Sequence, residues 1–510
     1  MDLVVAVQEA AAAVRAGGGD TVGRLFDALL DVDETGNADL AGEALRVLQE
    51  MPRVVARLDE WGRRIVWQAT TSSQRVDQVA QRLAAGAAGP VAVALASTHR
   101  DGHVRERAVE RILAAPLPEW MPFVVLRTAD WVRPVRDRAR VGLALLLADA
   151  PATYLAAVLG VTLLGRGRQR GGFAYTQALA ALLAASPAVR DGLLTAGRAQ
   201  WRFVYEVGMA QGWWSADVLF SLAVAEHDPG TRVRATEVVC RRAVWSNQVD
   251  TLLRLSRHPH PQVRALALTG LLRLGCDADV AGRLDDPAPL VRAIARAAAR
   301  RGGANAVEHY RAAVAAGDPP PGAIAGLAET GSQSDASLLE QLLASSTTQV
   351  RVQAVRASRQ LDAVPIERTI RLLRDPSPAV VREATAALRP FTRAVPAELA
   401  WDLLAEAHRV DLRRAGYRLL RVRTVVEQLK AALLLAGDPN PRLARRAVAD
   451  ATRLARDAAT PAWRRLRLPA LDLTPAQIAD LAGLVERAAA ALGPDTAGLL
   501  RAWLAKTTPS

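Results

Sequence analysis

Apolar residues recur along this chain at a spacing of three and four positions, which places them on one face of a helix. The segment that begins at Val263 shows the pattern clearly, with Leu266, Ala267 and Leu271 following at i+3, i+4 and i+8. This period is typical of an amphipathic helix with one buried stripe. Gly275 lies directly after the stripe and is placed to end the helix. Similar stripes elsewhere predict an all-α protein.

Each stripe follows a turn rich in Asp, Pro and Ser, and then an aliphatic residue, Arg, two further residues and Ala. Asp or Ser before a helix caps free backbone N–H groups, and Pro is favoured in the first turn. The turns with this pattern span residues 99–105, 130–136, 228–234, 258–264, 286–292, 345–351 and 375–382, with weaker copies at 408–413 and 438–443.

The aliphatic residue recurs at a fixed interval. Val350, Val381, Leu412 and Leu443 are each 31 residues apart. A constant period in this range indicates stacked supersecondary units, and two short helices with two turns fill this length. The sequence therefore predicts an α-solenoid of about 13 to 16 stacked helix pairs.

The Asp-Pro turn and the Val-Arg step resemble HEAT repeats of the short bacterial form, an armadillo-type fold. The resemblance covers about residues 91–460. It implies a structural ladder in which the turn Asp pairs with the helix Arg of neighbouring repeats, broken where His258 and Ser345 replace Asp. The residues that it assigns to the ladder are Asp228, Arg234, Arg264, Asp286, Arg292, Arg351, Asp375 and Arg382.

Three regions follow from where the period holds. Residues 1–90 are interpreted as degenerate helical repeats or a cap, and residues 91–460 as the array, with an irregular stretch near 136–232. Residues 461–510 leave the period and are interpreted as a C-terminal helical cap, in which Thr474 and Gln477 form a plausible capping box.

Charge adds one expectation about partners. The formal net charge is +13, and all but two of the 65 basic residues are Arg. An excess of Arg beside abundant Ala is typical of a GC-rich bacterial genome, and a positive field favours anionic partners.

The two cysteines suit a reducing compartment, and no signal peptide is expected. No membrane span is expected either, because Asp149 and Pro151 break the longest apolar region. A cytoplasmic location is predicted.

Catalytic chemistry finds little support in the residue pattern. His99 and His103 have the spacing of two metal ligands on a helix, but they lie in a turn with Gly102 and are interpreted as solvated. No His-Glu dipeptide of the di-iron type, nucleophile motif or phosphate loop occurs. We therefore expect no metal, no cofactor and no enzymatic activity.

Tryptophan is concentrated where the period breaks. Eight of the 11 Trp lie between residues 61 and 245 and a Gly-Arg loop, residues 165–172, lies within this range. Arg and Trp are enriched at binding hot spots, although these Trp could also fill larger gaps between irregular repeats. The candidate partner-binding residues are Arg166, Arg168, Arg170, Trp201, Arg202, Trp213 and Trp214.

The leading hypothesis is a non-catalytic scaffold that binds a protein partner with an acidic face through a concave solenoid surface. The alternative is a nucleic-acid binder of the alkylpurine DNA glycosylase type. HEAT-like enzymes of that type use Trp, Asp and Arg on a concave basic surface. Asp130 and Trp131, with Arg133 and Arg136, are similar to that residue set. The two hypotheses differ in where the arginines should lie.

Overall fold

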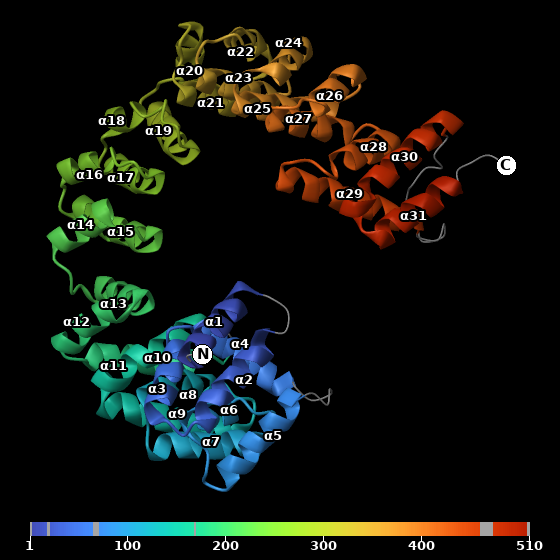
Figure 1. The fold of residues 1–510 in the computed structure, drawn as a ribbon. Helices are drawn as coiled ribbons and strands as arrows, with labels where there is room; N and C mark the ends of the chain where they lie inside the picture. Colours follow the sequence, from blue (N-terminus) through green and yellow to red (C-terminus); the bar gives the residue numbers. More distant parts are fainter. Residues whose placement is uncertain (1–2, 18–20, 65–70, 168–169, 460–472, 507–510) are drawn as a thin grey trace. The chain divides into compact units, whose positions relative to one another are not determined.

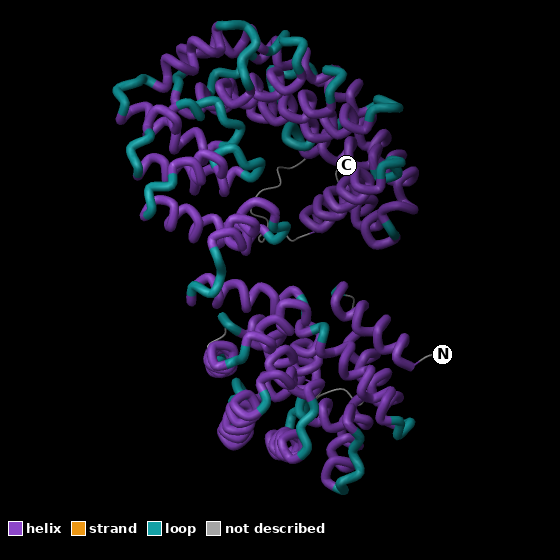
Figure 2. Tube along the Cα trace, turned by 90° about the vertical axis from the view of Figure 1, so that its left-hand side faces the viewer, coloured by secondary structure: helices purple, strands orange, loops and turns teal. Residues whose placement is uncertain are grey.

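The computed structural model describes residues 3–17, 21–64, 71–167, 170–459 and 473–506. Within these ranges the chain forms 31 α-helices and four short 3₁₀ helices, and no strand (Figure 2). The prediction of an all-α, solenoid-like helical repeat fold is confirmed.

The chain divides into two compact units, Met1–Val238 and Val239–Ser510, which we call the N-terminal and C-terminal units. The boundary falls inside helix α15 (Pro229–Trp245). None of the described helices is long and apolar enough to cross a bilayer.

The helices before α15 build the N-terminal unit. They are α1 (Leu3–Ala16), α2 (Thr21–Glu34), α3 (Ala38–Gln49), α4 (Pro52–Arg64), α5 (Thr71–Ala84), α6 (Pro90–Ala96), α7 (Gly102–Ala114), η1 (Pro118–Trp120), α8 (Met121–Arg127), α9 (Arg133–Asp149), α10 (Pro151–Gly165), α11 (Gly172–Ala184), α12 (Pro187–Ala196), α13 (Arg198–Gln211) and α14 (Ala216–Ala225).

The helices after α15 build the C-terminal unit. They are α16 (Val249–Leu255), α17 (Pro261–Arg273), α18 (Asp277–Ala281), α19 (Pro289–Arg301), α20 (Ala306–Ala315), α21 (Pro321–Thr330), η2 (Gln333–Asp335), α22 (Ala336–Leu342), α23 (Thr348–Gln360), α24 (Ile366–Arg371), η3 (Leu372–Arg374), α25 (Pro378–Leu388), η4 (Arg389–Phe391), α26 (Ala397–Leu404), α27 (Val410–Leu420), α28 (Val425–Leu435), α29 (Pro441–Ala459), α30 (Pro475–Leu492) and α31 (Pro494–Ala505).

The C-terminal unit stacks its helices in the order of the chain. The second helix of each pair packs on the second helix of the next pair, from α17 through α19, α21, α23 and α25 to α27. The first helices, α16, α18, α20, α22, α24 and α26, pack beside them (Figure 1). In α17 the buried face includes Val263, Ala267 and Leu271, and Gly275 follows in a left-handed conformation with a φ of 79°. The predicted stripe and the predicted stop are both present.

The N-terminal unit does not follow this simple order. Helices α3 and α4 pack against η1, α8 and α10, which lie far along the sequence from them. The residues interpreted as a degenerate cap therefore form part of a core with the middle of the unit. That core joins residues of α1 through α13 in one apolar cluster.

The ladder is built from one recurring arginine geometry. Arg264 Nε and Nη2 donate to the two carboxylate oxygens of Asp286 at 2.9 and 2.7 Å, while Nη1 donates to the carbonyl oxygens of His258 and Pro259. Each guanidinium therefore closes its own turn and holds the next one through charge-assisted, bidentate bonds. The same arrangement joins Arg351 to Asp375, Arg413 to Asp438 and, in the N-terminal unit, Arg105 to Asp130.

In most of these turns the residue six positions before the ladder position accepts the backbone N–H two residues later; before Arg413 that role falls to Glu406, seven positions earlier. Asp286 and Asp375 accept through a carboxylate oxygen, His258 through Nδ1 and Ser345 through Oγ. The position therefore requires a hydrogen-bond acceptor rather than an acid, which explains how His and Ser replace Asp without loss of the turn.

Two ladder predictions each miss the position by two residues. Arg234 was expected in the ladder, but Arg232 occupies it and donates to the carbonyl oxygen of Glu226, six residues earlier. Arg234 is exposed and lies 3.6 Å from Glu206. Asp228 likewise is not the turn residue, a position that Glu226 occupies, although Asp228 does accept a hydrogen bond from Arg202 of the preceding α13. It caps α15 by accepting the N–H and hydroxyl of Thr231.

Arg382 is also outside the ladder. Val381 stands six residues after Asp375, so Arg382 points about 100° away around the helix and pairs with Glu383 at 3.3 Å instead. The missing donor comes from the following turn, because Arg409 Nη2 donates to the carbonyl oxygen of Asp375 at 2.8 Å.

Arg292 closes its own turn by donating to the carbonyl oxygen of Asp286 at 2.7 Å, but its outer partner is Glu329 rather than a turn Asp. Arg296 shares that carboxylate at 2.5 Å. Burial alone would raise the pKa of Glu329, and the hydrogen bonds from the two guanidinium groups outweigh it, so the pKa is lowered. A glutamate on a helix thus substitutes for the lost turn residue.

Candidate functional site

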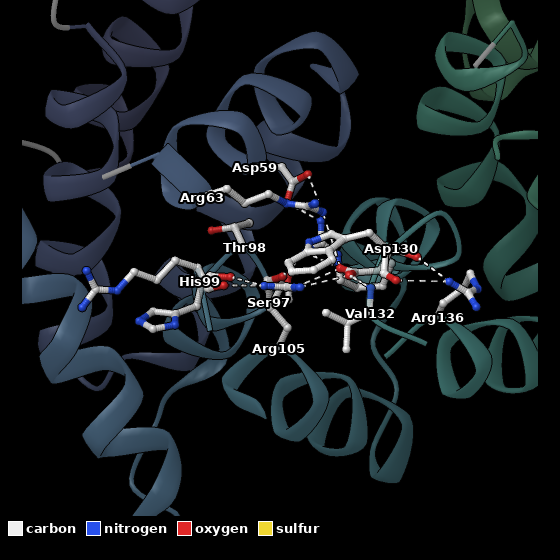
Figure 3. Close-up of polar contacts among 12 residues, drawn as sticks. Asp59, Arg63, Ser97, Thr98, His99, Arg105, Asp130, Val132 and Arg136 are labelled. Carbon is white, nitrogen blue, oxygen red and sulfur yellow. Dashed lines mark hydrogen bonds and ion pairs between the residues drawn. The ribbon is translucent and has the colours of Figure 1, made fainter. Parts of the chain in front are cut away.

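The N-terminal unit contains a buried network of charged side chains (Figure 3). It includes Arg105 and Asp130, which form one rung of the ladder, that is, one pair of a ladder arginine and the acid that it binds. Asp130 is 0% exposed and receives Arg105 Nε and Nη2 at 2.9 and 3.0 Å. Arg127 Nη1 lies 3.3 Å and Arg63 Nη2 3.5 Å from the same carboxylate. Three guanidinium groups therefore converge on one carboxylate.

A second carboxylate, Asp59, joins the network from α4. It accepts hydrogen bonds from Arg127 and, at 3.2 Å, from Arg63 Nε. Asp59 and Arg63 are one helical turn apart, so both side chains project from the same face of α4 toward α8 and the turn that follows it. The network therefore depends on the packing of α4 against α8.

Electrostatics of the network follow from burial and pairing. Burial would raise the pKa of Asp130, but the hydrogen bond from Arg105 and the charge of Arg127 outweigh it and lower the pKa. Burial lowers the pKa of Arg127, and the carboxylate of Asp59 opposes that shift. Three guanidinium groups and two carboxylates leave one positive charge in excess.

A cavity of about 300 Å³ lies beside this network, within the range of small-molecule sites. Its walls come from α4, α8, α10, α11 and the end of the Gly-Arg loop. The lining residues are Ala56, Asp59, Glu60, Arg63, Val125, Leu126, Thr128, Ala129, Val161, Thr162, Leu164, Gly165, Arg170, Gly171 and Ala174. Aliphatic and alanine side chains form most of the wall, with the charged groups on α4 and the loop.

The predicted tryptophans of α13 and the turn after it pack against one another rather than standing free. Tyr205 lies between Trp201 and Trp214, with ring centroids 4.6 Å from each. Trp213 and Trp214 are partly buried against the core, and a Cβ at Gly208 would lie only 2.5 Å from Trp214 Nε1. The aromatic residues therefore fill space at an irregular helix junction, which was the alternative to a role as binding hot spots.

The predicted arginines do not form one free basic patch. Arg166 lies 4.4 Å from the ring centre of Tyr175 and 3.3 Å from Glu206, and Arg202 pairs with Asp228. Arg170 lines the cavity, so it lies at a different site from Arg202. The predicted Arg168 lies outside the described residues.

Sequence reasoning missed Asp59, Arg63 and Arg127 entirely. Asp59 and Arg127 are 68 residues apart, and no motif links them. It also missed Arg190, whose guanidinium lies 3.9 Å above the ring of Trp213. The available signal was the Val-Arg repeat, which does locate Arg105 but says nothing of helices outside the period.

His99 was interpreted as solvated, and the structure shows it buried. Its Nδ1 accepts the N–H of Asp101 at 3.0 Å, so it occupies the turn position of its repeat. Burial lowers the pKa of His99, with a further contribution from Arg100. Among the described residues no group of three or more His, Cys, Asp or Glu is arranged to hold a metal ion.

Asp130 and Trp131, named for the DNA glycosylase alternative, are adjacent in the sequence but differ in surroundings. Asp130 is fully buried in the ion network, whereas Trp131 is 68% exposed. Arg136 Nη1 donates to the carbonyl oxygen of Asp130 at 3.1 Å and therefore closes the turn. In this arrangement the Asp serves as the rung of the ladder.

An exposed apolar face lies on α9. Val141 and Leu145 are 61% and 64% exposed and stand one helical turn apart. They border an open groove of about 560 Å³ that Leu113 of α7 also lines. The helices approach closely there because Gly142 has no side chain to meet Leu113.

Comparisons with known proteins assign neither a family nor a function. No family model and no curated protein matches the chain. Among solved structures it is similar to an engineered protein, at 15% identity over 88% of this chain and 98% of that chain, with a TM-score of 0.15. It is also similar to YibA of Escherichia coli, at 11% identity over 70% and 99% of the two chains, with a TM-score of 0.17.

Proposed function

We propose that this chain is a non-catalytic helical-repeat scaffold that binds a protein partner through the apolar groove between α7 and α9. The observation that carries the proposal is the pair Val141 and Leu145, both more than 60% exposed on one face of α9. Exposure of two large aliphatic side chains next to each other on a helix is energetically unfavourable in water, and such a patch is typical of a surface that a partner covers. A groove lined by Leu113 and Leu146 gives that partner a place to insert apolar side chains.

Charge around the groove favours an acidic partner. The start of α9 carries Arg133, Arg136, Arg138 and Arg140, and the acids that pair with them are Asp137 of α9 and Glu106 and Glu110 of α7. Four guanidinium groups and three carboxylates leave one positive charge in excess beside the groove, which Arg138 lines. A helix with an apolar stripe and acidic flanks matches this surface in shape and charge. Such a partner agrees with the acidic face expected from the basic composition.

A peptide selection tests the proposal without knowledge of the natural partner. A display library of random helical peptides is selected against the whole chain. We expect acidic amphipathic peptides that lose at least about ten-fold in affinity in the double variant Val141→Lys/Leu145→Lys, because hot-spot contacts each contribute more than about 1 kcal/mol. Leu290→Lys is the matched control, since Leu290 is also an exposed aliphatic residue on a helix, at 55%.

Two outcomes would contradict the proposal. In one, the selected peptides bind the double variant as well as the wild type. In the other, the chain binds duplex DNA with an affinity that falls steeply with salt, as counterion release requires, and selects no acidic peptide. The second outcome would move the function to nucleic-acid binding.

A further inference from the structure

The cavity beside the ion network contains a polar group that the fold leaves unused. Thr162 of α10 lines it, and Thr162 Oγ1 is buried without a hydrogen bond to any residue that the structure describes. A buried hydroxyl without a partner destabilises the fold, because its hydrogen bonds to water are lost and not replaced. A ligand that enters the cavity would supply the missing partner.

Other helical threonines in the chain satisfy their hydroxyl groups locally. Thr236, Thr269 and Thr385 each donate to the carbonyl oxygen four residues earlier, at 2.7 to 2.8 Å. That bond is the usual choice for a threonine inside a helix. Thr162 Oγ1 makes no such bond, and Thr162 is one of the α10 residues that line the cavity.

Charge around the cavity indicates the sign of the missing partner. Asp59 faces the cavity, but its charge is balanced by Arg127 and Arg63. Arg63 is the network's partly exposed guanidinium, and Arg170 adds a second, exposed guanidinium to the lining. With Glu60 included, the network and the cavity lining carry four guanidinium groups and three carboxylates, so the site keeps one positive charge in excess.

We infer that this cavity binds a small organic monoanion, a carboxylate with an apolar body. The carboxylate is held by Arg63 and Arg170 and by the hydroxyl of Thr162. The apolar body lies against Val125 and Val161, which line the same cavity. A volume of about 300 Å³ suits a short chain or a single ring rather than a long lipid. This site is separate from the groove on α9 and does not depend on the scaffold function.

Calorimetric titration of the whole chain with octanoate, 1-octanol and octylammonium tests the inference. These probes share the apolar chain and differ in the charge of the head group. We expect one octanoate per chain, bound at least about ten-fold more tightly than octanol, since hydrogen bonds to charged groups contribute about 1.5–3 kcal/mol. Octylammonium should bind weakest. No octanoate binding, or octanol as tight as octanoate, overturns the inference.

Variants locate the site. Arg63→Gln should weaken octanoate at least about ten-fold and leave octanol unchanged, and Thr162→Val should weaken octanoate several-fold. If Arg63→Gln does not fold, Arg170→Ala carries the same test from an exposed position. Thr269→Val and Arg301→Ala, both in the C-terminal unit, are the matched controls and should not change the affinity. Unchanged binding in the folded arginine variant overturns the inference.

Discussion

The same pair of arginine and aspartate occurs in both units, but its surroundings differ. In the C-terminal unit the rungs between an arginine and a turn Asp join residues 22 to 25 apart, as in Arg264 with Asp286 and Arg413 with Asp438. In the N-terminal unit the rung of Arg105 and Asp130 is joined by Arg63 and Arg127, and it lies next to a cavity. The difference arises because α4 packs back on α8 and α10. A repeated structural bond becomes part of a candidate site when helices outside the repeat return to it.

This contrast also changes how each unit should respond to damage. Stability in a linear array is approximately a sum of units and nearest-neighbour interfaces, so one lost rung has a local effect. In the N-terminal unit one carboxylate serves three guanidinium groups from several helices. The loss of that carboxylate should affect the whole unit.

The largest expected effect is that of Asp130→Asn. It removes the fully buried carboxylate on which three guanidinium groups converge, and breaking a buried ion pair costs about 3–5 kcal/mol. Asp286→Asn, which breaks the single rung with Arg264, should cost about 1–3 kcal/mol. Urea unfolding measures both, with hydrogen exchange to show which unit opens. Equal losses in the two variants would show that the buried network is no more than another rung.

A second comparison separates two arginines that follow valine in the same motif. Arg292→Ala should lower the free energy of unfolding by about 1–3 kcal/mol, because it leaves the turn carbonyl of Asp286 without its donor and Glu329 with Arg296 alone. Arg234→Ala should change it by less than about 0.5 kcal/mol, as expected for an exposed side chain. Thermal melts with Arg301→Ala as a surface control decide. A large loss in Arg234→Ala would restore the original ladder assignment.

Close helix packing gives a third comparison. A Cβ at Gly416 in the C-terminal unit would lie 2.5 Å from the carbonyl oxygen of Ala400, which is backbone, so Gly416→Ala should cost about 1–3 kcal/mol. Gly208→Ala should cost less, because the indoles beside Gly208 can shift. Gly498→Ala meets nothing within 4 Å and should stabilise by about 0.5–1 kcal/mol. Chemical denaturation ranks the three, and a different order would contradict the packing.

The last comparison concerns the stability of the fold at low pH. Burial would raise the pKa of Asp228, but hydrogen bonds from Arg202 and Thr231 lower it to about 2, from an ordinary value of 3.8. A carboxylate whose pKa is lowered by folding stabilises the fold above its unfolded pKa and loses that contribution as pH falls. The melting temperature should therefore fall between about pH 4 and 2, and less so in Asp228→Asn. Identical acid profiles would show that Asp228 is not held by these bonds.

Periodicity predicted the fold because the repeat is local. The stripe of Val263 and Leu271 and the capping pair Thr474 and Gln477 depend only on neighbours in the chain, and the structure has them as expected. The candidate site could not be predicted in the same way. Asp59 reaches Arg127 only after α4 packs on α8, and nothing in the local pattern encodes that contact. The ladder lies between these cases, since the sequence pattern located Arg264 and Arg351 correctly but missed the ladder position by two residues at Arg234 and by one at Arg382.

The rung that Val381 leaves empty has a consequence for how such arrays evolve. Its turn is closed instead by Arg409, which donates to the carbonyl oxygen of Asp375 from the next turn. A substitution at such a position should therefore cost little once a neighbour can reach the same carbonyl. Mutational drift can then erase the motif copy by copy while every turn stays closed, and designers of repeat proteins can relocate an arginine instead of conserving it.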